Sequence, residues 1–244
     1  MQPDTIRQLN AINREFYRVI AAEFDQTRGT AWLGWEKLLP HLKAPQSTTP
    51  FSVLDVGCGN GRFGVFLAEK LRCELDYHGI DNNEVLLEHA MQAVSTAPGV
   101  ATTLELRDVV ENPPVSGEYD LVAAFGLLHH IPGGEQREAS VRRLAERVRP
   151  GGILALACWR FYEFDRFRAR IVPWPETLKA QVERHDYLLD WRRGEVALRY
   201  CHYVDDAEQD ALVQGTGLTE IDRFRADGYT GTVNSYSVLR KKPD

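Results

Sequence analysis

The sequence predicts an α/β fold: a seven-stranded, mostly parallel sheet with an antiparallel edge strand, helices on both faces and a small cap insertion. Two patterns indicate this class. Short β-branched and apolar runs alternate with segments whose apolar residues recur at helical spacing, and a glycine-rich turn follows the first such run, Phe51 to Val56. At 244 residues with 43% hydrophobic content, the chain is long enough to bury one core. We therefore expect one domain over residues 1–244.

Residues 1–50 are expected to form a helical segment that covers the core or a bound cofactor. Its apolar side chains follow one helix face, at Ile6, Leu9, Ile12, Phe16, Val19 and Ile20. Tyr17 lies beside this stripe, where its hydroxyl can bind a cofactor carboxylate or its ring can pack. Arg28 follows the stripe and is either a cation that binds the substrate or the partner of Asp25.

Residues 51–160 are expected to form the cofactor-binding core. The turn after the first strand contains Gly57, Cys58, Gly59, Asn60 and Gly61, and a helix over residues 62–71 follows it. Glycines allow positive φ and close approach of the backbone to a ligand, at the edge where open α/β sheets bind ligands. Because Gly59, Gly61 and Gly64 also fit a dinucleotide-binding turn, glycine spacing alone leaves the cofactor class open, as well as a turn without any ligand.

Acidic residues end three of the predicted strands and separate these cofactor classes. Asp55 stands where a dehydrogenase usually has an apolar residue; it organises the turn around a zwitterionic methionine moiety or caps loop amides. Asp81 suits the two ribose hydroxyls, or caps the helix that starts at Asn82. Asp108 suits the exocyclic amine of adenine, or is a solvated loop acid. This order of acids favours S-adenosylmethionine over a dinucleotide.

The remaining elements complete the sheet and add a cap. Strands are expected over residues 77–81, 102–107, 119–125, 153–159, 218–224 and 235–241, and helices over 134–149 and 206–215. Residues 161–200 interrupt the alternation and are too long for a simple connection, so they are expected to cap the site. Four aromatic residues in or just before residues 161–200 are expected either to stack on a base, to line an apolar pocket or to pack within the cap. They are Trp159, Phe161, Tyr162 and Trp174. Residues 201–244 supply the last helix and the strand pair.

Composition argues against several classes of function. The net charge of −6 and the pI near 5.7 disfavour a broadly basic nucleic-acid surface. No run approaches the roughly 18 apolar residues of a membrane helix, and the amino terminus lacks an apolar signal core, so we expect a cytoplasmic protein without membrane contact. The cysteines show no metal-ligand spacing, so neither disulfides nor a metal site is expected; they are Cys58, Cys73, Cys158 and Cys201.

Five stretches together resemble the class I S-adenosylmethionine-dependent methyltransferases, which have a Rossmann-like sheet. They are VLDVGCGNG (53–61), GIDNN (79–83), LRD (106–108), YDLVAAFGLLHHI (119–131) and VRPGGILAL (148–156). The resemblance implies that the methionine end is held by Asp55, Gly57 and Gly59, the ribose by Asp81, and the adenine by Asp108 and Val109. Further cofactor contacts are expected from Tyr17, Cys58, Asn60, Asn82 and Phe125.

A narrower resemblance links the chain to the eukaryotic tRNA methyltransferases that esterify a carboxymethyl group on wobble uridine. It rests on Tyr17 to Arg28, Trp32, Arg199-Tyr-Cys-His202 and Tyr236 to Arg240. It implies that Arg28 binds the acceptor carboxylate, which needs positioning more than a general base, and that a small zinc-binding subunit activates the enzyme. His130 is the second catalytic candidate, as a base or orienting group, or it shapes the pocket.

The methyl acceptor has two candidate sources from sequence, a tRNA or a small molecule that is methylated on oxygen or nitrogen beneath the cap. Binding to tRNA that weakens steeply with salt would indicate the first. A protein of another class, a non-catalytic S-adenosylmethionine-binding scaffold for a partner enzyme, would bind the cofactor without turnover.

Overall fold

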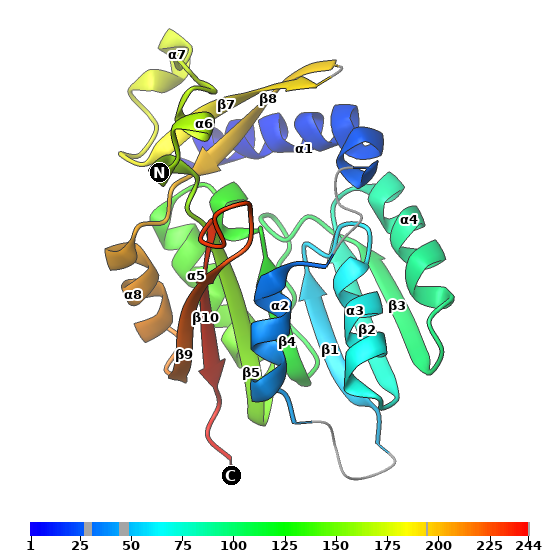
Figure 1. Ribbon diagram of the computed structural model, residues 1–244. Coiled ribbons are helices and arrows are strands. Elements are labelled where there is room, and N and C mark those ends of the chain that lie inside the picture. Colours follow the sequence, from blue (N-terminus) through cyan, green and yellow to red (C-terminus); the bar gives the residue numbers. More distant parts are fainter. Residues whose placement is uncertain (27–30, 44–48, 194, 244) are drawn as a thin grey trace.

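The computed structural model describes residues 1–244 except 27–30, 44–48, 194 and 244, and shows a sheet with strand order β3-β2-β1-β4-β5-β10-β9 (Figure 1). The strands are β1 (Phe51–Val56), β2 (Leu75–Asp81), β3 (Val100–Leu106), β4 (Tyr119–Phe125), β5 (Val148–Trp159), β9 (Thr219–Ala226) and β10 (Asn234–Arg240). Strands β1 to β5 pair in parallel, and β10 runs antiparallel to both β5 and β9. The predicted fold class is confirmed. The antiparallel strand is β10, which lies between β5 and the edge strand β9.

Helices cover both faces of the sheet because each strand alternates its side chains between them. In β1, Val53 and Leu54 are both fully buried, and they belong to core clusters on opposite faces. The first face is covered by α2 (Leu33–Leu38), η1 (Leu39–His41), α3 (Arg62–Leu71) and α4 (Glu84–Ser95), and the second by η2 (Leu128–His130), α5 (Gly134–Glu146) and α8 (Asp206–Gln214). None of the helices in the described part of the chain is long and apolar enough to cross a membrane.

Four strands begin earlier than predicted, and the difference is largest in β5. It starts at Val148 instead of Ile153, ahead of the glycine pair that indicated a stop. Val148 pairs with Tyr119 and Ile153 pairs with Leu121, so the residues between them bulge out of the ladder without ending the strand. The preceding helix, predicted to reach residue 149, therefore ends at Glu146.

Residues between β5 and α8 form a separate layer, called the cap below, above the carboxyl edge of the sheet (Figure 1). The cap contains a three-stranded antiparallel sheet in the order β6-β7-β8. Its elements are η3 (Phe161–Glu163), α6 (Asp165–Arg168), β6 (Ile171–Val172), α7 (Glu176–Lys179), β7 (Asp186–Arg193) and β8 (Glu195–His202). Helix α1 (Pro3–Gln26) packs against β8, where Phe16 and Ile20 are buried with Ala197. Helix α1 and the cap, together called the roof below, thus cover the carboxyl edge of the sheet. They come from two distant parts of the sequence.

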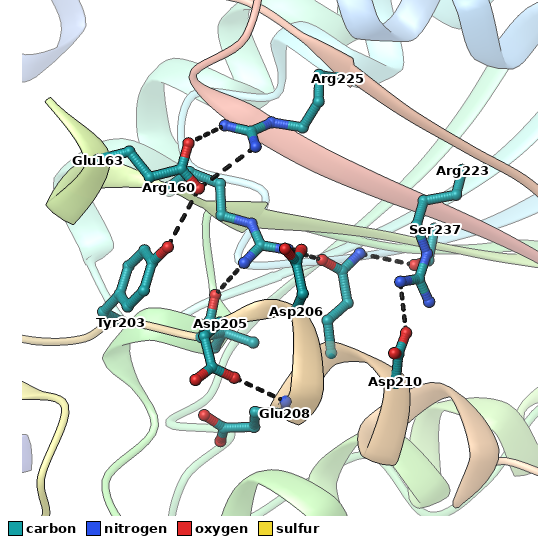
Figure 2. A network of polar contacts seen from close by, with 12 residues as sticks. Arg160, Glu163, Tyr203, Asp205, Asp206, Glu208, Asp210, Arg223, Arg225 and Ser237 are labelled. Atoms are coloured by element: carbon teal, nitrogen blue, oxygen red, sulfur yellow. Dashed lines mark hydrogen bonds and ion pairs between the residues drawn. The ribbon is translucent and has the colours of Figure 1, made fainter.

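Polar contacts fix the start of the cap to the sheet (Figure 2). Arg160, directly after β5, is fully buried; it donates to the carbonyl oxygen of Val204 at 2.8 Å and to the Asp206 carboxylate at 2.5 Å. Glu163 of η3 accepts from Arg225 of β9 at 2.7 Å. Since these contacts gather at the junction of β5, α8 and β9, the first turn of the cap is held in a defined position above the strand ends.

Candidate functional site

A cavity of about 580 Å³ lies at the carboxyl edge of the sheet, between the ends of β1 to β5, helix α1 and the cap. Its wall includes every cofactor-binding residue that the sequence singled out: Tyr17, Asp55, Gly57, Cys58, Gly59, Asn60, Asp81, Asn82, Asp108, Val109 and Phe125. His130 also lines the cavity, whereas Arg28 falls outside the described residues, so its role stays a prediction. Parallel strands place their carboxyl ends at one edge, which explains why these residues meet.

The glycine turn after β1 keeps one wall of the cavity open. Gly57, Gly59 and Gly61 have φ of +76°, +55° and +74°, values that residues with side chains rarely adopt. At Gly61 a Cβ would also lie 2.8 Å from Val94 of α4, so glycine lets the turn pack on that helix. At Gly59 a Cβ would have no described atom within 4 Å. The space beside this backbone is therefore available to a ligand.

Asp81 joins the end of β2 to the glycine turn. Its Oδ2 accepts from the Gly59 amide at 2.8 Å, and its Oδ1 accepts from the Asn83 amide at 3.0 Å. Burial raises the pKa of the Asp81 carboxyl, and the backbone donors oppose this shift. The N-cap of α4 is Asn83, whose side chain accepts from the Leu86 amide, so the capping alternative for Asp81 is wrong. Each Asp81 oxygen has a further lone pair with which to accept from a ribose hydroxyl.

Asp55, at the end of β1, is almost completely buried beneath the turn. Tyr77 of β2 donates its hydroxyl to Asp55 Oδ2 at 2.7 Å. Burial raises the pKa of Asp55 to about 7, and the hydrogen bond from Tyr77 opposes this shift only in part. The amides of Gly57 and Cys58 donate to the carbonyl oxygen of Ile80, at 2.8 and 3.0 Å. Asp55 therefore changes charge near neutral pH, and these two turn amides are satisfied without it.

Asp108 connects the end of β3 to helix α1. Its Oδ1 accepts from the Val110 amide at 3.0 Å, and its Oδ2 accepts from Asn10 at 2.8 Å and from Arg14 at 3.2 Å. The alternative of a solvated loop acid is therefore wrong, and the adenine contact stays a prediction. Asn10 and Arg14 were not found from the sequence, because polar residues beside an apolar helical stripe normally indicate the solvent face.

Tyr17 and His130 meet in the cavity wall. The Tyr17 hydroxyl lies 2.9 Å from His130 Nε2, and His130 Nδ1 lies 3.1 Å from the carbonyl oxygen of Tyr200 in β8. A carbonyl oxygen can only accept, so Nδ1 carries the hydrogen, and Nε2 of the neutral ring accepts from Tyr17. The imidazole thus bridges α1, η2 and β8. The catalytic role of His130 and the cofactor contact of Tyr17 stay predictions.

The cap side of the cavity is aromatic and basic. The described cap-side residues here are Trp159, Arg166, Phe167, Trp191 and Arg199. Of the four aromatic residues considered from the sequence, Trp159 lines the described cavity, while Phe161 is fully buried and Trp174 packs beside buried Tyr200. Phe167 and Trp191 gave no distinguishing signal, because the cap sequence lacks a regular period.

Two clusters in the described part of the chain combine metal-ligand residue types, with ligand atoms within 4.8 Å of one another in each. They are His129, His130 and Cys201, and Glu183, Asp186 and His202. In the second cluster, the buried Arg137 donates to Glu183 at 3.0 Å, which gives that acid a structural partner. The expectation that the protein needs no metal stays a prediction.

Comparison with known proteins identifies the core. Residues 54–154 match the family model of the methyltransferase domain. A tRNA (carboxymethyluridine(34)-5-O)-methyltransferase of Macaca fascicularis is 27% identical over 162 residues, which are 64% of this chain and 22% of the relative. A 27-O-demethylrifamycin SV methyltransferase of Amycolatopsis mediterranei is 26% identical over 191 residues, 78% of this chain and 64% of the relative. The chain therefore spans less than two thirds of the length of these relatives.

Solved structures share the fold over most of the chain. A SAM-dependent methyltransferase from Methanosarcina mazei, 17% identical, superposes with a TM-score of 0.65 over 85% of this chain and 98% of that one. SAM-bound CalS10, an amino pentose methyltransferase from Micromonospora echinaspora, is 17% identical. It superposes with a TM-score of 0.58 over 91% of this chain and 97% of that one.

The fold and the acids at the strand ends are those of the class I S-adenosylmethionine-dependent methyltransferases, and the family match agrees with this class. Residues 54–154 match the methyltransferase domain, and structures with the same fold have been solved with S-adenosylhomocysteine or S-adenosylmethionine bound. The open space at Gly59 and the carboxylate of Asp81 fit a nucleoside of this kind. The class inferred from the sequence motifs is confirmed.

Proposed function

We propose that the protein transfers a methyl group from S-adenosylmethionine to an oxygen of an anionic acceptor, most simply a carboxylate. The separation of charge along the cavity supports this proposal. The strand-end half is lined by Asp55, Asp81 and Asp108, and its two arginines, Arg62 and Arg107, already donate to Asn60 and Glu105. The described cap half carries Arg166 and Arg199. The sulfonium and ammonium groups of the cofactor suit the acidic half, and a negatively charged acceptor suits the basic half.

The proposed chemistry depends on positioning. When bound, S-adenosylmethionine supplies an electrophilic methyl group: its bond to sulfur breaks, the electron pair stays on sulfur, and a bond to the acceptor oxygen forms. A carboxylate is already ionised at neutral pH, so no side chain has to remove a proton. Asp81 and the glycine turn hold the nucleoside, while α1 and the cap exclude water. Exclusion of water favours a reaction in which opposite charges neutralise each other.

The names of both relatives include an oxygen position, which supports oxygen as the acceptor atom. The finer form of the proposal is a carboxymethyluridine-like group in tRNA, in line with the narrower resemblance of the sequence. In this form Arg28 binds the carboxylate together with the cap, and a small activating subunit assists. These two features and a cytoplasmic location stay predictions.

A small-molecule hydroxyl is the second candidate acceptor, and the contact between Tyr17 and His130 favours it. A hydroxyl must lose its proton during transfer, and a neutral imidazole that accepts from a phenol can take up that proton through the phenol oxygen. The rate of a hydroxyl substrate would then rise with pH around the pKa of this pair, whereas transfer to a carboxylate needs no such rise.

The experiment has two stages. Calorimetry with S-adenosylhomocysteine measures cofactor binding, and failure to bind would sink the proposal. Radiolabelled S-adenosylmethionine is then offered with unmodified and carboxymethyluridine-containing tRNA and with a panel of aromatic acids, phenols and amines. Base-labile label, the property of a methyl ester, supports the carboxylate; base-stable label on a phenol supports the second candidate. Tight binding with no transfer to any class indicates the scaffold.

A further inference from the structure

We propose that Arg199 binds the anionic group of the methyl acceptor, and that the acceptor presents this group on a flat aromatic ring. This inference rests on the proposed function, because it assigns the acceptor side of the same cavity. Its basis is the position of Arg199 among aromatic rings, its distance from described acids, and the rigid strand that carries it.

The Arg199 guanidinium is held by rings and not by acids. Its central carbon lies 4.5 Å from the centre of the Trp159 ring and 5.3 Å from that of Phe16. Within the described residues, no carboxylate lies at ion-pairing distance from it and no hydrogen-bond acceptor engages it. A guanidinium has five N–H donors, and ring faces offer no oxygen to satisfy them. The donors of Arg199 therefore suit an acidic oxygen of a ligand in the cavity.

The backbone next to Arg199 is fixed from two sides. The amide of Tyr200 donates to Asn13 of α1 at 2.9 Å, and its carbonyl oxygen accepts from His130 Nδ1 at 3.1 Å. Both contacts are buried. Arg199 is thus one residue away from a point where α1, η2 and β8 are joined. A side chain on such a strand is held with the precision that orienting a substrate requires.

A row of rings extends from Arg199 toward the start of the cap. The Trp159 and Phe167 ring centres are 4.9 Å apart, and the Arg166 guanidinium carbon lies 4.6 Å from the centre of Phe167. Trp191 lines the same cavity from β7. Aromatic faces of this kind favour planar rings, because stacking combines apolar burial with matched quadrupoles. The wall therefore selects a flat acceptor, with Arg199 at the inner end of the row and exposed Arg166 at the outer end.

Two further arginines of the described cavity wall have polar partners, whereas Arg166 contacts the rings of Phe164 and Phe167. Arg107 donates to Glu105 at 2.7 Å, and Arg62 donates to Asn60 in the glycine turn at 3.1 Å. Both lie on the cofactor side. This leaves Arg199 as the inner cation on the acceptor side. Arg199 can therefore bind the acceptor within the same cavity that holds the cofactor.

The test compares carboxylates with amides of the same shape. The probes are 5-carboxymethyluridine with its amide, 5-carbamoylmethyluridine, and phenylacetate with phenylacetamide. Ligand-observed NMR titration measures their binding with and without S-adenosylhomocysteine. We expect each carboxylate to bind the wild type at least about tenfold more tightly than its amide, because a charge-assisted bidentate contact is lost in the amide. Arg199→Gln should remove this preference, and Arg199→Lys should keep part of it.

Arg168→Gln is the matched control, because Arg168 is an exposed arginine of α6 that pairs with Asp165 and does not line the cavity. It should leave the preference unchanged. Equal binding of acid and amide by the wild type, absence of binding included, overturns the proposal. So does a preference that survives in Arg199→Gln; if that variant fails to fold, an undiminished preference in Arg199→Lys counts equally against the bidentate contact.

Two further arms separate the sources of the acceptor and the two proposals. An RNA stem-loop carrying carboxymethyluridine that binds more tightly than the free nucleoside, with steep salt dependence, assigns the acceptor to nucleic acid; equal affinity assigns it to a small molecule. Both results support the proposed role of Arg199, provided that Arg199→Gln loses the preference for the carboxylate over the amide. Failure of S-adenosylhomocysteine to bind would defeat the proposed function, while the titrations without it still test Arg199.

Discussion

The Tyr17 hydroxyl donates to His130 Nε2 across 2.9 Å and joins the amino-terminal helix to the turn after β4. Because His130 Nδ1 also bonds to the carbonyl oxygen of Tyr200 in β8, one imidazole connects three elements that close over the cavity. Donation from Tyr17 to Nε2 requires the neutral ring. If His130 were protonated, Tyr17 would have to turn from donor to acceptor, so the geometry of the roof is coupled to the protonation of this ring.

Replacing Tyr17 by Phe keeps the ring and removes this contact. We expect the free energy of unfolding to fall by about 1 kcal/mol, because His130 Nε2 loses its donor. Urea unfolding at pH 7.5 measures the change. Tyr229→Phe is the control, since Tyr229 is 97% exposed. Equal stability of the two variants would show that the contact contributes nothing to holding the helix.

Replacing Asp81 by Ala should weaken binding of S-adenosylhomocysteine by roughly 30-fold, the usual scale for losing a charged hydrogen-bond acceptor. The loss has two parts, the ribose contact and the restraint on the Gly59 amide. Calorimetry measures it. Asp76→Ala, on the same strand but exposed, should bind like the wild type. Wild-type affinity in Asp81→Ala would exclude this acid from the cofactor site.

Asp55 couples stability to pH in the direction opposite to that of a salt-bridged acid. Its pKa is about 7 in the folded protein and near 3.8 in the unfolded chain, so between these values only the folded state holds the proton. Its contribution is therefore complete below pH 3.8 and is lost as pH rises through about 7. Asp55→Asn should be more stable than the wild type by about 4 kcal/mol at pH 8, with little difference at pH 4.

Urea unfolding at the two pH values tests this expectation. Asp76→Asn, which removes an exposed acid from β2, should show no such dependence. A difference between Asp55→Asn and the wild type that stays constant from pH 4 to pH 8 would contradict the raised pKa.

The strand-end residues could be predicted from sequence because local pattern and topology agree there. Apolar runs indicate buried parallel strands, parallel strands align their carboxyl ends, and an acid at or near the end of such a run lies at that edge. Asp55, Asp81 and Asp108 all follow this rule and line one cavity. The glycine turn follows for the same reason, since its positive φ values are needed wherever the chain turns toward α3.

The roof of the site could not be predicted because it depends on pairing across long stretches of chain. Asn10 meets Asp108 over a separation of 98 residues, and Asn13 meets Tyr200 over 187. No local period encodes which polar residue of α1 faces an acid and which faces solvent. The cap hairpin shows the same difficulty: charged residues within β7 and β8 hid their alternation, so the region was predicted only as a cap insertion.

Arg137 is the clearest test of how the cap is held. It is 2% exposed on α5 and donates to Glu183 of the cap at 3.0 Å, to Glu208 of α8 at 2.7 Å and to the carbonyl oxygen of Ile131 at 3.0 Å. Arg137→Met keeps the apolar stem but leaves Glu183 without the Arg137 cation and Glu208 with His202 alone. Unfolding by urea should therefore show a loss of about 2 kcal/mol. Exposed Arg143→Met on the same helix should show little change. If both variants lose equally, apolar packing alone holds the cap.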